Sequence, residues 1–368
     1  MDSKIKELVN SIKQVNTYKD INIMEVCGTH TMAISKSGLR QLLPANINLI
    51  SGPGCPVCVT SIKDIDWMLE IIKKYNVCVF TFGDMLRVPG SSSSLYTEKS
   101  KGKSIRICYS PTDALEFAKN NPEKNVIFVA IGFETTIPLI AVTAKRAYEE
   151  NINNFYIYNT HKLIPPALDL LLSDKKVKID GLLCPGHVSV IIGSKPYDFI
   201  PKKYNVPCVI SGFEPVDILT SVKMILKQIK ENHSEVQIQY SRAVRKEGNP
   251  TAVSQTYDVF EKTASEWRGL GCMPESGLKL KSEYLKFDAA KNFPVGKVYS
   301  KEHPGCECGD ILKGIKKPYE CKLFSKACTP GSPVGPCMVS NEGTCAAYYK
   351  YEKFNLNRKT KISGKKGE

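Results

Sequence analysis

The chain alternates between short runs of β-branched and apolar residues and longer stretches in which apolar residues recur at helical spacing. Most of the short runs end in a glycine or proline loop before the helical pattern begins. This order is typical of strand, loop, helix units around a parallel sheet, and it predicts an α/β fold. The predicted strands lie near Ile23 to Val26, Asn48 to Ser51, Val77 to Thr81, Ile105 to Tyr109, Val126 to Ile131, Phe155 to Tyr158, Gly181 to Leu183 and Cys208 to Ser211.

The pattern occurs twice in the first two thirds of the chain. Gly-Phe-Glu follows a strand at 132–134 and again at 212–214, and the loop at 52–58 has a counterpart at 184–187. We therefore expect two similar parallel-sheet α/β domains that face a central cleft. Their predicted ranges are residues 1–125 and 126–240. Ligands of such sheets bind beyond the carboxyl ends of the strands, so loops of both domains would line this cleft.

The last third of the chain has a different character. Beyond about Ser241 regular strand spacing is absent, and six cysteines lie between Cys306 and Cys345. We interpret residues 241–368 as a C-terminal domain of helices and loops. Metal ligation would supply the order that apolar burial alone does not.

Composition narrows the classes of protein. A chain of 368 residues with 42% hydrophobic and 24% charged residues is typical of a folded globular protein. Its first residues lack the apolar stretch of a signal peptide, and its apolar runs are shorter than the roughly 20 residues of a membrane helix. We expect a cytoplasmic protein with no membrane segment. The formal charge of +14 fits solubility or an acidic protein partner rather than nucleic acid, because the lysines are dispersed and not interleaved with aromatic residues.

Fourteen cysteines without an export signal indicate metal binding or redox chemistry, since cytosolic thiols otherwise stay reduced. Four of the six C-terminal thiolates could hold a 4Fe-4S cluster, which would leave two as a redox pair or as free thiols. A zinc knot is the alternative, but the paired C-x2-C hooks of zinc ribbons are missing here. The six cysteines are Cys306, Cys308, Cys321, Cys328, Cys337 and Cys345.

Cys55-Pro-Val-Cys58 follows a predicted strand at a point where a helix should begin. A C-x2-C at a helix amino terminus suits reversible disulfide chemistry, because the helix dipole lowers the pKa of the first thiol. Half of a zinc site is the alternative, although no second C-x2-C completes it.

Cys27-Gly-Thr-His30 ends the first predicted strand. A thiol three residues from an imidazole could ligate a metal or act as a nucleophile, and Gly28 lets a ligand approach closely. A buried cysteine beside an incidental histidine is the plain alternative.

Other loops place polar side chains in the same predicted cleft, where we expect them to bind substrate. Any one of them alone could be a helix cap or a solvated surface residue. They are Asp84, Arg87, Glu134, Thr135, His161 and His187.

These motifs, in this order, resemble the HypD family of hydrogenase maturation factors over roughly residues 20–350. The similar motifs are Cys-Gly-Thr-His at 27–30, Gly-Pro-Gly-Cys-Pro-Val-Cys at 52–58, Gly-Asp-Met-Leu-Arg-Val-Pro-Gly at 83–90, Gly-Phe-Glu-Thr-Thr at 132–136, Cys-Pro-Gly-His-Val at 184–188, Gly-Phe-Glu-Pro at 212–215, Pro-Glu-Ser-Gly-Leu at 274–278, Pro-Cys-Met-Val-Ser at 336–340 and Gly-Thr-Cys-Ala-Ala at 343–347.

The resemblance implies a scaffold on which the Fe(CN)2CO centre of nickel-iron hydrogenase is assembled. Its partners would be the chaperone HypC, which shares the iron, and HypE, which delivers cyanide. The hydrogenase large subunit would receive the finished centre. Whether turnover occurs on this chain, and hence whether it is an enzyme, stays open.

The resemblance also implies roles for particular residues. Cys27 would ligate the iron with His30 nearby, and Cys55 and Cys58 would be the dithiol between the cluster and the iron site. Cys308 and Cys337 would be a second redox pair. The cluster ligands would be Cys306, Cys321, Cys328 and Cys345.

Two other classes of protein are weighed against this one. A free-standing thiol-disulfide oxidoreductase that resembles ferredoxin:thioredoxin reductase accounts for the thiols, but not for the Cys-Gly-Thr-His loop. A zinc-stabilised nucleic-acid-binding protein lacks the basic, aromatic stripe that such a protein needs. Metal content separates the latter from the other two, and affinity for HypC separates the scaffold from the oxidoreductase.

Overall fold

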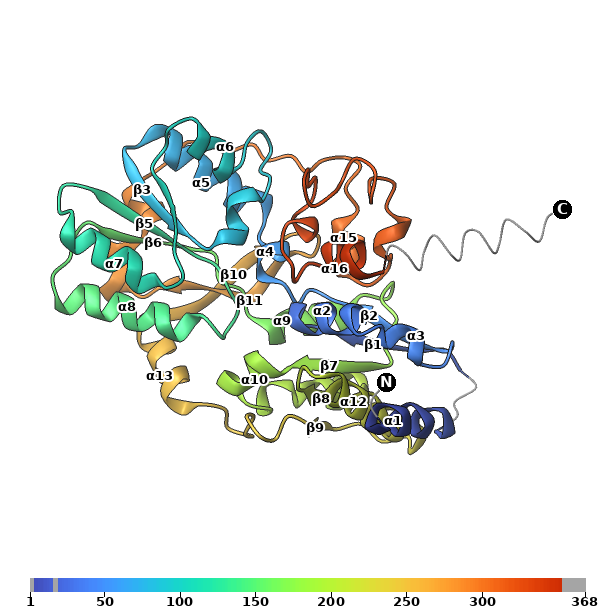
Figure 1. The fold of residues 1–368 in the computed structure, drawn as a ribbon. Coiled ribbons are helices and arrows are strands. Elements are labelled where there is room, and N and C mark those ends of the chain that lie inside the picture. Colours follow the sequence, from blue (N-terminus) through green and yellow to red (C-terminus); the bar gives the residue numbers. More distant parts are fainter. Residues whose placement is uncertain (1–2, 16–18, 353–368) are drawn as a thin grey trace.

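The computed structural model describes residues 3–15 and 19–352, and its strands form two parallel sheets and one antiparallel hairpin (Figure 1). The α/β prediction is thus confirmed, and each of the eight predicted strands is present within a few residues of its expected place. The end of the third predicted region, residues 353–368, lies outside the described residues.

The first sheet has five strands in the order β2-β1-β7-β8-β9. Helices α1 and α12 pack beside each other, and α12 lies against β7 and β8. The strands are β1 (Ile21–Glu25), β2 (Ile47–Ser51), β7 (Gly181–Pro185), β8 (Cys208–Ser211) and β9 (Val236–Ile238). The helices of this unit are α1 (Ser3–Gln14), α2 (Gly28–Lys36), α3 (Leu39–Leu42), α10 (Gly186–Ile192), α11 (Phe199–Tyr204) and α12 (Pro215–Lys230), with the short 3-10 helix Lys195–Tyr197.

The second sheet has four strands in the order β4-β3-β5-β6. Its strands are β3 (Val77–Thr81), β4 (Ile105–Ile107), β5 (Asn125–Ala130) and β6 (Phe155–Asn159). The helices of this unit are α5 (Ile62–Lys74), which precedes β3, and α6 (Leu95–Ser100), α7 (Pro111–Asn120), α8 (Ile137–Glu149) and α9 (Ile164–Ser173), with the 3-10 helix Gly83–Arg87. The short helix α4 (Pro56–Val59) lies in the connection from the first sheet to the second.

The sequence led us to expect one sheet in residues 1–125 and the other in residues 126–240. The two sheets do not divide the chain at residue 125. The chain leaves the first sheet after β2, builds all of the second sheet, and returns to the first at β7, which pairs with β1. Local patterns reveal where strands begin and end. Pairing is decided instead by hydrogen bonds between segments far apart in the chain, which those patterns do not record.

Along the strands of both sheets, successive side chains point to opposite faces and so enter different hydrophobic cores. Met24 and Leu182 of the first sheet and Val79 and Ile127 of the second share one central core with the C-terminal cysteines. The opposite faces form two outer cores, under α1 and α12 on one sheet and under α7 and α8 on the other. Both faces of each sheet are therefore buried, as parallel sheets require.

The chain also forms an antiparallel hairpin that was not predicted from the sequence. Strands β10 (Phe260–Trp267) and β11 (Gly271–Leu280) pair antiparallel in a region where we expected no regular strands. Helix α13 (Pro250–Val259) precedes the hairpin, and the 3-10 helix Ser282–Phe287 and α14 (Ala289–Asn292) follow it.

The last described segment packs beside α2 and α4 (Figure 1). It is mostly loop, as expected. Its elements are α15 (Cys308–Leu312), the 3-10 helices Pro318–Glu320 and Pro336–Met338, and α16 (Thr344–Tyr351).

Truncation of a side chain on the central strand β7 tests the shared core. Leu182 is completely buried, so Leu182→Ala should lower the free energy of unfolding by about 2–5 kcal/mol through lost burial and a cavity. Urea unfolding measures this loss. The control Leu139→Ala on α8, where the side chain is 48% exposed, should change stability by less than about 0.5 kcal/mol. Equal effects of the two changes would contradict the assigned core.

Candidate functional site: a buried line of thiols

Two loops that leave the same edge of the first sheet bring Cys27 and the Cys55–Cys58 pair together. Glu25 and Ser51 are paired at the ends of the parallel strands β1 and β2, so both chains emerge side by side. The Gly28 N–H donates to the Gly54 carbonyl at 2.8 Å. A Cβ on Gly54 would lie only 2.2 Å from the Cys27 nitrogen. Only glycine allows the two loops to approach this closely.

The thiols of this motif are in contact and lie in the protein interior. The Cys55 and Cys58 sulfurs are 2.7 Å apart, and the Cys55 sulfur also accepts the Cys58 N–H at 3.3 Å. Cys58 is completely buried, and this burial raises the pKa of its thiol. Helix α4, at which we expected a dipole to act, has only four residues. The two sulfurs are thus already in contact and are shielded from solvent.

The line of sulfurs continues into the C-terminal segment. The Cys58 thiol contacts the Cys337 thiol, and its sulfur lies 3.9 Å from the Pro336 carbonyl oxygen. The Cys337 sulfur is in turn 2.7 Å from that of Cys308. A continuous row of thiols therefore leads from the end of β2 to the cysteine-rich segment.

All six C-terminal cysteines line one small cavity. The thiol of Cys345 has Cys328, Cys306 and Cys321 as its electrostatic neighbours, and the thiol of Cys308 interacts with both Cys337 and Cys306. In the described ranges, no three Cys, His, Asp or Glu side chains approach closely enough to hold a single metal ion. The donor set itself is chemically suited to a thiolate-bound iron-sulfur cluster, since each potential ligand is a cysteine.

A carboxylate that the sequence analysis missed adjoins Cys27. Glu342 accepts a hydrogen bond from Thr29 Oγ1 at 2.8 Å, and its Cβ would be 2.4 Å from a Cβ placed on Gly28. Burial raises the pKa of the Cys27 thiol to about 12, and the Glu342 charge adds to this rise. Burial also raises the pKa of Glu342. The signal in the sequence that could have identified Glu342 is its place between the motifs at 336–340 and 343–347.

Asp84 and Arg87, from the loop after β3, both reach the C-terminal segment. Asp84 Oδ2 accepts from Ser340 Oγ at 2.7 Å, and its charge acts on Glu342. Arg87 is exposed and donates to the Pro330 carbonyl at 3.1 Å. Asp84 is therefore part of the surroundings of Cys27, and Arg87 lies further out on the same segment.

His30 lies on the same turn as Cys27, but its ring is held by a different loop. Its Nε2 is 2.9 Å from the Gly212 carbonyl oxygen, and its ring centroid lies 4.8 Å from that of Phe213. His187, which is exposed, stacks on Phe213 at 3.9 Å. Burial lowers the pKa of His30 to about 4, so the ring is neutral at physiological pH. These two histidines thus lie near each other around one phenylalanine.

The structure places Glu134 away from this group. Its Oε1 accepts the Ile164 N–H at 2.9 Å, and its Oε2 is buried without a partner. It lines a separate cavity of about 650 Å³ between α9, α13 and the hairpin. Thr135 is exposed beside it. The predicted substrate-binding side chains are therefore not gathered in one cleft, although what they bind stays a prediction.

Among the residues that the structure describes, none of the helices combines the length and apolar character needed to cross a bilayer. The fold and the site together define an α/β protein with two parallel sheets, two thiol-bearing loops at one edge of the first sheet, and a buried row of thiols.

A family model described as the hydrogenase formation hypA family, HypD, matches residues 3–352. The chain belongs to the HypD family. It is 44% identical over 353 residues to the hydrogenase maturation factor HypD2 of Bradyrhizobium diazoefficiens, covering 94% of this chain and 93% of that protein. It is also 43% identical over 341 residues to HypD of Cupriavidus necator, with 90% of each chain covered. The family resemblance read from the motifs is thus confirmed.

The buried carboxyl of Glu134 should make stability depend on pH. Burial raises its pKa from the usual 4.5 to about 7, so between these values the folded protein holds a proton that the unfolded chain has released. Stability therefore falls as pH rises across this window. Relative to Glu134→Gln, the natural protein should lose roughly 3 kcal/mol over it.

Urea unfolding at a series of pH values measures this difference. The control Glu149→Gln, at an exposed position of α8, should leave the pH dependence as it is in the natural protein. Parallel curves for the natural protein and Glu134→Gln would show that the carboxyl does not bind the proton upon folding.

Proposed function

We propose that this HypD-family chain is the scaffold and redox protein on which the Fe(CN)2CO centre of nickel-iron hydrogenase is assembled, in a cytoplasmic complex with HypC and HypE. The observation that carries the proposal is the row of thiols from Cys55 to Cys308, which begins where the Cys27 loop packs on the Cys55 loop. The names of the relatives support the link to hydrogenase maturation.

Cys27 is the ligand we assign to the iron that is being built. Soft thiolates suit iron that carries cyanide and carbon monoxide. The thiol of Cys27 holds its proton strongly because of burial and Glu342, so iron would have to displace that proton. Glu342, with its own raised pKa and a stronger electrostatic effect on this thiol than Glu25, is the group that could receive it. His30 would hold the turn in place through Gly212.

Cys55 and Cys58 are the dithiol in this proposal. Oxidation of both thiols to a disulfide releases two electrons and two protons, and their sulfurs are already in contact. Cys337 and Cys308 form the second pair, and they connect the dithiol to the cysteine-lined cavity. Electrons would pass along this row between the iron site and the cavity.

Cys306, Cys321, Cys328 and Cys345 would hold a 4Fe-4S cluster in this cavity. When bound, such a cluster supplies one-electron transfer. Two observations support this choice of four. Cys345 has the other three as its electrostatic neighbours, and the two remaining cysteines are already in contact with each other. Cys306 and Cys321 are only partly buried, which would give electrons a route to the surface.

A free-standing reductase of protein disulfides is less well supported. Such an enzyme must bring a thiol to the disulfide of another protein, but Cys58 is completely buried and Cys55 is 3% exposed. Assembly in a complex needs no such exposure, because the acceptor is built inside the site.

The division of the six cysteines can be tested by metal analysis of protein purified without oxygen. The natural protein should carry about four iron and about four sulfide per chain. Cys345→Ser should lose most of both, whereas Cys308→Ser should keep them because Cys308 is assigned to the redox pair. Stoichiometric zinc without sulfide, or loss of iron from Cys308→Ser but not from Cys345→Ser, would contradict the assignment.

The role of Cys27 predicts a different outcome. Cys27→Ala should keep the iron, the sulfide and the visible absorbance of the cluster, because Cys27 does not line the cysteine cavity. In a strain that lacks the natural protein, Cys27→Ala should fail to support hydrogenase maturation. Cys78→Ala, a buried thiol of β3, is the matched control and should support maturation. A Cys27→Ala protein that matures hydrogenase would remove Cys27 from the proposed iron site.

A further inference from the structure

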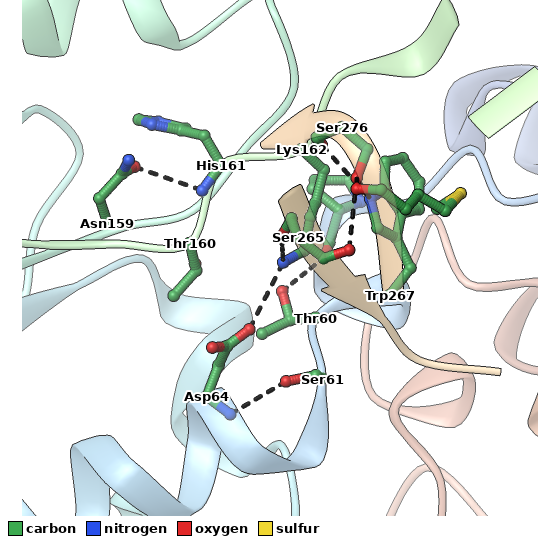
Figure 2. A network of polar contacts seen from close by, with 12 residues as sticks. Thr60, Ser61, Asp64, Asn159, Thr160, His161, Lys162, Ser265, Trp267 and Ser276 are labelled. Atoms are coloured by element: carbon green, nitrogen blue, oxygen red, sulfur yellow. Dashed lines mark hydrogen bonds and ion pairs between the residues drawn. The ribbon is translucent and has the colours of Figure 1, made fainter. Parts of the chain in front are cut away.

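Lys162 is a buried lysine for which the proposed function gives no role. It lies three residues after the end of β6, and its side chain is only 2% exposed. Its Nζ donates to Ser265 Oγ at 2.6 Å and forms an ion pair with Asp64 Oδ2 at 3.4 Å. Figure 2 shows the ammonium between these two groups, with Asp64 on helix α5 and Ser265 on strand β10.

A buried ion pair is weak evidence for stability, because desolvation offsets the attraction. Replacement of such a pair as a whole by apolar residues is often neutral for stability. What the lysine adds is geometry, since one cation joins three segments that are distant in the chain. Its backbone contributes as well, with a hydrogen bond from the Lys162 N–H to the Gly132 carbonyl at 3.1 Å and a β-bridge to Gly277.

The hairpin is shaped to receive this lysine. A Cβ on Gly277 would lie 2.5 Å from the Ser265 Cβ, so the glycine lets Ser265 take its place. Ser276 accepts the Trp267 indole N–H at 3.1 Å, which orients the end of β10. The Pro-Glu-Ser-Gly-Leu motif at 274–278, to which the sequence analysis assigned no chemistry, thus serves this network (Figure 2).

Lys162 contacts the hairpin near the end of β10. This same end contacts residues 59 and 60, just after the Cys55–Cys58 pair. Trp267 forms a β-bridge with Thr60, and the Arg268 N–H donates to the Val59 carbonyl at 2.8 Å. Val59 directly follows Cys58. On the other side, Ser61 caps helix α5 by accepting the Asp64 N–H at 3.1 Å. The segment between Cys58 and α5 is therefore held by β10 on one side and by α5 on the other. Both elements bind the ammonium of Lys162.

We propose that Lys162 is a positioning residue for the Cys55–Cys58 dithiol: its ammonium joins helix α5 to the hairpin and so holds residues 59–61, which directly follow the second thiol. The importance of this role rests on the proposed function. Its test does not, because it reads the thiols directly.

The test is the rate at which each cysteine is alkylated by N-ethylmaleimide in full-length protein, purified without oxygen and freed of reductant, followed by peptide mass spectrometry. Lys162→Met keeps the length and apolar stem of the side chain but removes the cation. We expect it to raise the alkylation rates of Cys55 and Cys58 by about tenfold or more through local opening. The rates of Cys78 and Cys208, which are buried in β3 and β8, should stay unchanged.

Matched variants make the outcome specific. Lys162→Arg keeps a cation and should restore much of the protection. Lys119→Met removes a half-exposed lysine that pairs with Glu150, and it should change none of the four rates. If Lys162→Met does not fold, Asp64→Asn breaks the same ion pair at a side chain that is 26% exposed, and the same selective rise is expected.

Two results would overturn the proposal. One is protection of Cys55 and Cys58 equal to that of the natural protein in Lys162→Met, or in Asp64→Asn if only that variant folds. The other is an equal rise at all four cysteines, which would mean that Lys162 supports overall stability only. Neither result depends on cluster content or hydrogenase maturation, so failure here is distinguishable from failure of the proposed function.

Discussion

The pairing of β1 with β2 on one side and with β7 on the other is the constraint on which the rest of the structure depends. All three strands are parallel, so their carboxyl ends meet at one edge of the sheet. That edge carries the loops with Cys27, Cys55 and His187. A strand between two partners has every backbone group satisfied and both faces buried, which makes its end a rigid place for a reactive side chain.

Burial of the thiols governs the chemistry that the site can perform. In the low dielectric of the central core the pKa values of Cys27 and Cys58 rise, so both groups stay protonated and unreactive toward solvent. Reactivity then requires a group that takes up the proton or a metal that displaces it.

Charged side chains hold the C-terminal segment on this edge. Arg40, on helix α3, pairs with Glu352 at the end of the described chain and donates to the Leu49 carbonyl of β2. Its guanidinium also lies over the Tyr348 ring. Helix α16, which carries Cys345, is thus attached to the same strands that position Cys27. Together with the contact of Lys162 with the hairpin, these contacts keep the sulfurs of separate segments in one row.

The sequence by itself determined the class of fold, eight strands of the two parallel sheets and the family, and it singled out the cysteine motifs. These features are local: alternation, glycine and proline loops, and cysteine spacing follow from neighbours in the chain. Tertiary structure alone decided that β1 pairs with β7, that Glu134 lies in a cavity apart from Cys27, and that Glu342 lies beside that cysteine. It also decided that Lys162 bridges Asp64 and Ser265. Each of these depends on contacts between distant segments, which hydrogen bonding and packing select only when the whole chain is folded.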